Sequence, residues 1–171
     1  MKAMLESQSF GKGPISAVSL YSHSRDCFAA FLRWLYLGEF TYTGSNYYTC
    51  ANAWHLGHKL LCPAFQNAAM LHLIRSHHEF YESGEVWKAV MRVAYPVSEP
   101  KSSLRRWVVD QMIFDVRVGK PGTAMEEFIT GAAQSGNKQD LAWDYMKASV
   151  KAGNEVKDPF DNTASYMEAV A

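Results

Sequence analysis

The sequence has no excess charge of either sign. Lys plus Arg and Asp plus Glu both number 17, so the chain generates no long-range field that would attract nucleic acid or an anionic membrane surface. It also lacks a run of about 18 apolar residues, the length that a membrane-spanning helix needs. We therefore predict that it binds neither nucleic acid nor membrane.

Cysteine is scarce. The three thiols, Cys27, Cys50 and Cys62, are scattered, and no basic stretch followed by an apolar segment and a cleavage site is visible at the N-terminus. Scattered thiols without a secretory signal are typical of a reducing compartment and do not predict a disulfide framework. We expect an intracellular protein, in cytoplasm or nucleus, that is not secreted.

The composition is that of an ordinary globular protein, with 48 % hydrophobic and 20 % charged residues in 171. That length suffices for one domain with a core and a small extension. An apolar pattern at helical spacing predicts one helix face, made of Phe28, Phe31, Leu32, Leu35 and Tyr36. Gly38 follows where a helix commonly ends. A second helix is expected over residues 47–61, and Pro63 is well placed to open a third.

The chain is expected to divide into three segments, over residues 1–80, 81–152 and 153–171, and the last of these is expected to be a disordered tail. Within the first, residues 15–20 predict a strand. In the middle segment, helices are predicted over residues 85–95 and 104–118, the second capped by Ser102 or Ser103. Thr123 caps another predicted helix, and Leu141, Tyr145 and Ala148 share a face of the last one. In the tail, Tyr166 and Met167 could dock.

Three motifs in order carry a family resemblance. Residues 31–40, FLRWLYLGEF, resemble the F-x-x-F, W-L-Y-T-G segment of BTB/POZ domains. Residues 53–60, AWHLGHKL, are similar to that family's A-x-x-L-G-D-K-L, and residues 65–70, FQNAAM, to its F-x-N-x-A-M, most like the fungal branch. Residues 103–111 resemble the family's helical extension more weakly. The resemblance implies a mainly α chain: the C-terminal helical half of a BTB/POZ-like α+β fold with one residual strand, plus an α-helical extension.

The resemblance also bears on where the chain begins. Residues 1–6 resemble the helix that precedes the family's last sheet element, F-x-A-M-L, so the opening strands and helices of that fold would be missing. The chain would then start in the middle of the fold. A truncated paralogue or a mis-started gene model without biochemical activity is an alternative that the residues leave open.

BTB/POZ domains are interaction modules, so the resemblance implies a non-catalytic adaptor or scaffold with protein partners and no cofactor. Tentative partner-binding residues are Phe10, Lys12, Trp34, Tyr36, Tyr47 and Tyr48. Aromatic side chains are enriched at interfaces, although core packing is the commoner use of such residues. Lys12 stands where the family's hydrophobic-x-Glu motif has its acid, which argues against cullin binding. Exposed apolar surface would allow self-association.

A different class of protein is the alternative: a metal-binding protein or a cysteine-dependent enzyme that uses Cys50, His55, His58 and Cys62. The spacing matches no zinc-binding pattern, and neither Cys27 nor Cys62 lies in a nucleophile motif. We therefore expect no bound metal and no catalytic residue. Arg105 and Arg106 beside Trp107 are interpreted as a solvated helix face with local ion pairs.

Overall fold

The computed structural model describes residues 25–41, 47–79, 90, 93–96, 98–118, 138–153 and 156–170. Over these residues the chain is mainly helical and has no strand, as predicted for the class. The elements are α2 (Arg25–Leu37), α3 (Tyr47–Lys59), α4 (Pro63–Glu79), α6 (Ser103–Arg117), α8 (Lys138–Ala152) and the 3-10 helix η1 (Pro159–Tyr166). The predicted strand 15–20, the helix after Thr123 and most of the helix 85–95 lie outside the described residues. None of the described helices is long and apolar enough to cross a membrane.

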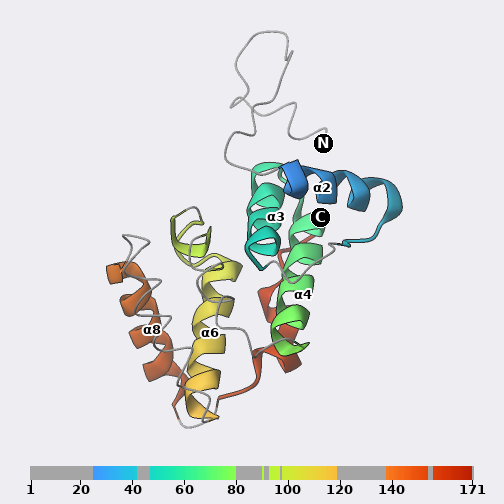
Figure 1. The fold of residues 1–171 in the computed structure, drawn as a ribbon. Coiled ribbons are helices and arrows are strands. Elements are labelled where there is room, and N and C mark those ends of the chain that lie inside the picture. Colours follow the sequence, from blue (N-terminus) through green and yellow to red (C-terminus); the bar gives the residue numbers. More distant parts are fainter. Residues whose placement is uncertain are drawn as a thin grey trace.

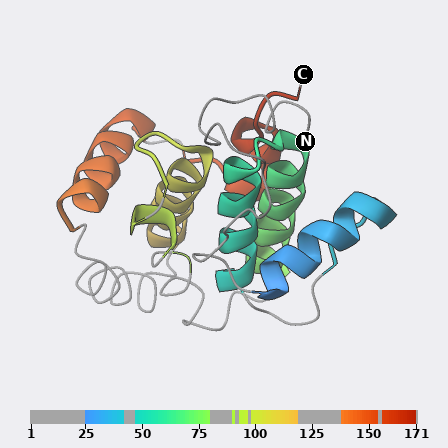
Figure 2. The same cartoon turned by 90° about the horizontal axis from the view of Figure 1, so that it is seen from above.

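Two layers of helices make up the described part of the chain (Figure 1). The helices α3 and α4 lie side by side, α2 lies across them, and α6 with α8 forms the other layer; η1 contacts both α4 and α6. The view from above separates the layers clearly (Figure 2). Pro63 opens α4 as predicted, and Gly38, with φ of 72°, follows the end of α2 in the left-handed region.

The α3 and α4 helices approach each other closely at Gly57. A Cβ atom added there would lie 2.7 Å from Gln66 Cγ and 3.0 Å from the Gln66 backbone nitrogen. Because the second atom belongs to the backbone of α4, the neighbour cannot rotate away. Glycine at this position therefore sets the distance between the two helices.

We expect Gly57→Ala to lower the free energy of unfolding by about 1–2 kcal/mol, because overpacking typically costs about 1–3 kcal/mol and the better helix propensity of alanine offsets part of it. Urea denaturation followed by circular dichroism measures the change. If contact with the Gln66 side chain contributes, Gln66→Ala should recover part of the loss in the double variant. A Gly57→Ala protein as stable as the wild type would show that the helices separate at little cost.

The α2 helix buries Cys27, Ala30 and Phe31, with Trp34 half-buried beside them. The Phe31 ring meets Phe65 of α4 edge-on at a centroid distance of 5.0 Å, and Trp34 lies 5.3 Å from the same ring. Of the apolar face predicted from the spacing, only Phe31 is buried. The physical reason is that α2 is apolar nearly all round, and only one of its stripes can face α3 and α4.

Arg105 joins the end of the helical residues 93–96 to α6. Its guanidinium donates from Nε to the Ala94 carbonyl at 3.2 Å and from Nη2 to the Tyr95 carbonyl at 2.7 Å. The side chain is buried, so the predicted solvated face is corrected here, although Arg106 is exposed. Ser102 caps α6, as predicted, by accepting a hydrogen bond from the Arg105 amide.

The C-terminal segment, residues 156–170, corrects the prediction of a disordered tail. Asn67 of α4 holds the Glu168 backbone on both sides: its Oδ1 accepts from the Glu168 amide at 2.7 Å, and its Nδ2 donates to the Glu168 carbonyl at 2.9 Å. Tyr166 is buried and donates to Asp110 Oδ2 at 3.0 Å. Burial raises the pKa of Asp110, and the Tyr166 hydrogen bond opposes that rise. These contacts, between residues 101 and 56 positions apart, carry no local sequence signal.

Candidate interaction surface

One side of α2 faces solvent although it is apolar. This surface, called here the α2 outer face, consists of Phe28, Leu32, Leu35 and Tyr36. Their exposed fractions are 38, 37, 43 and 79 %. The spacing i, i+4, i+7 and i+8 brings the four side chains together on one side of the helix. Contiguous apolar surface of this kind marks a contact site more often than isolated exposed residues do.

Polar side chains border the α2 outer face. Arg25 and Asp26 lie at its N-terminal end, Arg33 beside it and Glu39 just beyond its C-terminal end, and all four are exposed. An apolar centre with a polar rim is the general anatomy of a protein–protein interface. The α2 outer face has this general anatomy, an apolar centre within a polar rim.

The predicted partner-binding residues do not share one place. Tyr36 belongs to the α2 outer face, and Tyr48, at the start of α3, is 44 % exposed. Tyr47 is buried, and its hydroxyl donates to the Ser76 carbonyl at 3.0 Å. Trp34 packs against Phe65. Tyr47 thus belongs to the buried core, and Trp34 is half-buried against it.

Phe10 and Lys12, the remaining two predicted partner-binding residues, lie outside the described residues. The structure adds three exposed residues of the predicted apolar helix face: Phe28, Leu32 and Leu35. The sequence did contain a signal for their exposure, because Cys27, Ala30 and Trp34 form a second apolar stripe on the same helix. A helix with two such stripes has one left over once it packs on a single layer.

Two residues of the alternative prediction, Cys50 and His58, lie in different environments. Cys50 is buried, and desolvation raises the pKa of its thiol to about 12, so it stays protonated and is a poor nucleophile. His58 is exposed and lies parallel to the Trp54 ring at 6.1 Å. Over the described ranges, no three or more His, Cys, Asp or Glu side chains are placed to hold a metal ion.

The structure brings together one pair that the sequence prediction missed. His77 Nε2 and Asp115 Oδ2 lie 3.6 Å apart, both buried, and Gln111 donates to Asp115 Oδ1 at 2.9 Å. A His–Asp pair orients a base in many hydrolases, but it needs a nucleophile within reach. The residues that line the adjacent cavity include no Ser, Thr or Cys. The pair therefore connects α4 to α6.

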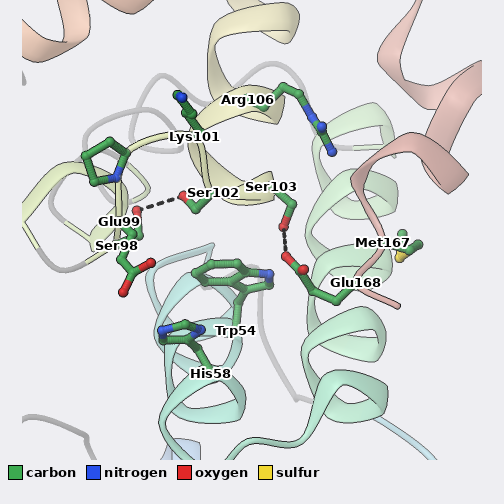
Figure 3. A pocket seen from close by; sticks show the side chains of 11 residues that line it. Trp54, His58, Ser98, Glu99, Lys101, Ser102, Ser103, Arg106, Met167 and Glu168 are labelled. Carbon is green, nitrogen blue, oxygen red and sulfur yellow. Dashed lines mark hydrogen bonds between the residues drawn. The ribbon is translucent and has the colours of Figure 1, made fainter. Parts of the chain in front are cut away.

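A second hollow, of about 410 Å³, lies between α3, the turn at residues 98–101, the start of α6 and the C-terminal segment (Figure 3). Trp54 and His58 form its floor. Ser103 Oγ donates to Glu168 Oε1 at 2.7 Å, so a carboxylate of the chain itself already lies at the N-terminus of α6. Its charged lining residues balance, with Lys101 and Arg106 against Glu99 and Glu168. This hollow thus lies where the C-terminal segment docks onto the start of α6.

Comparisons of this chain with protein-family models, with curated proteins and with solved structures find no match.

Proposed function

We propose that this chain is a non-catalytic protein-interaction module, an adaptor or scaffold inside the cell, that contacts protein through the α2 outer face. The observation that carries the proposal is this contiguous apolar surface with its polar rim. The resemblance of residues 31–40, 53–60 and 65–70 to BTB/POZ motifs supports it, because that family consists of interaction modules. Lys12 stands where the BTB/POZ motif has its acidic residue, and this reversal of charge argues against a cullin as the partner.

The energetics of the surface suit binding. Complete burial of a leucine or phenylalanine side chain is worth about 1.5–3 kcal/mol. Phe28, Leu32 and Leu35 are already more than half covered by their own helix and neighbours, whereas Tyr36 is mostly exposed. A partner that covers the rest would gain a fraction of that amount at each of the four positions. Such gains at neighbouring positions favour association through this surface.

Site-specific photo-crosslinking tests the proposal. A photoreactive phenylalanine analogue placed at Tyr36, which is 79 % exposed, should form protein adducts in cell extract, and an additional Leu32→Asp substitution should abolish them. The matched control carries the analogue at Trp143 of α8, which is 61 % exposed. Adducts that form equally at both positions, or that persist with Leu32→Asp, would contradict the proposal. The mass of each adduct shows whether it contains a second copy of the chain.

A further inference from the structure

We propose that the hollow between α3, the turn at residues 98–101 and the start of α6 binds the phosphate group of a small organic molecule. The hollow has a volume of about 410 Å³. Its donors for the phosphate oxygens are the N-terminus of α6, the indole N–H of Trp54 and two cationic side chains. None of the described residues that line it belongs to α2, so the inference goes beyond the proposed function.

An unused hydrogen-bond donor faces the hollow. Trp54 is 2 % exposed, and its Nε1–H has no hydrogen-bond partner among the residues that the structure describes. The nitrogen-bearing edge of the indole points toward the side of the hollow on which Glu168 lies (Figure 3). A buried donor without an acceptor is unfavourable, and a ligand that supplies the acceptor removes this penalty. The hollow therefore suits a ligand with hydrogen-bond acceptors.

The N-terminus of α6 supplies further donors. The first amides of a helix, here those of Ser103 and Leu104, have no partner within the helix, and the helix dipole favours negative charge at this end. The chain itself already places a carboxylate there, because Ser103 Oγ donates to Glu168 Oε1 at 2.7 Å. That carboxylate leaves the Trp54 N–H without an acceptor. Glu168 thus uses only part of what the hollow offers an anion.

Two cationic side chains, Lys101 and Arg106, line the hollow, and both are exposed. Arg106 donates to the Ser165 carbonyl, but a guanidinium has five N–H donors and retains others for a ligand. Ammonium, guanidinium, indole and helix N-terminus together suit the three oxygens of a phosphate better than the two oxygens of a carboxylate. The rest of the hollow has room for the organic part of the ligand.

Glu168 is an internal competitor for this site. With its carboxylate in place, the two acidic and two basic side chains of the lining balance. When the Glu168 side chain turns away from Ser103, one positive charge is left in excess beside the helix dipole. Asn67 binds only backbone groups of Glu168, so this turn does not require the C-terminal segment to leave α4. The phosphate then accepts the Ser103 hydrogen bond that the carboxylate gives up.

Nuclear magnetic resonance of the full chain tests the proposal. Each of the five tryptophans gives one indole N–H signal, and Trp54→Phe identifies the Trp54 signal by its loss. Inorganic phosphate should shift this signal and saturate with a Kd of about 1 mM, which is ordinary for so small a ligand. Glycerol phosphate should bind at least about threefold more tightly, because its organic part also contacts the hollow. Chloride at the same ionic strength should leave the signal in place.

Substitutions in the lining assign the site. Arg106→Met and Lys101→Met should each weaken phosphate binding at least about fivefold. Arg117→Met, which removes an exposed arginine from the other end of α6, should leave binding unchanged. Glu168→Gln should tighten binding about threefold or more, because it removes the competing charge and keeps an oxygen that accepts from Ser103. Circular dichroism confirms that each variant is folded.

A Trp54 signal that stays in place up to about 20 mM phosphate, or that moves equally in the Arg106→Met protein, would overturn the proposal. Equal affinity for inorganic phosphate and glycerol phosphate would contradict the assignment to an organic phosphate. A Glu168→Gln protein that binds no more tightly would remove the competition. None of these results depends on adducts at Tyr36, so this inference and the proposed function fail separately.

Discussion

Replacing Phe65 by alanine is expected to lower the free energy of unfolding by about 3–5 kcal/mol, the usual cost of truncating a buried aromatic side chain. The Phe65 side chain is fully buried, and the rings of Phe31, Trp34 and Phe40 lie 5.0, 5.3 and 5.7 Å from it. Two segments thus pack on one ring of α4. Its removal leaves a cavity that three rigid neighbours cannot fill, because each is anchored in another part of the backbone.

Denaturation in urea, followed by far-ultraviolet circular dichroism, measures the loss. The matched control is Phe28→Ala, which removes the same side chain from the α2 outer face, where it is 38 % exposed. We expect that change to cost less than about 1.5 kcal/mol, because the ring gives up only part of its burial. Equal losses for the two variants would mean that Phe65 is not the centre of the packing between α2 and α4.

Replacing Arg105 by methionine should lower the free energy of unfolding by about 2–4 kcal/mol. Hydrogen bonds to a charged group contribute about 1.5–3 kcal/mol each, and removing a donor also leaves buried acceptors unsatisfied. Arg105 donates to the carbonyls of Ala94 and Tyr95, and its guanidinium lies 4.6 Å from the centre of the Tyr95 ring. Methionine keeps most of the packing volume, so the loss reports mainly the polar contacts.

Two controls separate those contacts from charge alone. Asp140 lies 3.6 Å from Arg105 Nη1, but its side chain is 59 % exposed, so Asp140→Asn should cost less than about 1 kcal/mol. Arg117→Met removes an exposed arginine from the last turn of the same helix, with an expected loss within about 1 kcal/mol. If Asp140→Asn cost as much as Arg105→Met, the ion pair rather than the carbonyl contacts would hold this part of the fold.

The sequence by itself determined several helix ends among the described residues. Gly38 after α2, Pro63 at the start of α4 and Ser102 before α6 act through their own backbone preferences or through contacts within one turn. Such effects hold whatever the rest of the chain does. The mainly helical class followed from the same local patterns.

Only the tertiary structure decided which side of each helix faces inward. The α2 helix offers two apolar stripes of similar strength, and packing around Phe65 selected the one with Phe31 and Trp34, which left Leu32 outside. Arg105 is buried for a comparable reason: its partners are carbonyl groups of another segment. The docking of residues 156–170 depends on Asn67, about a hundred positions away. Contacts between distant residues depend on the path of the whole backbone, so no local pattern could predict them.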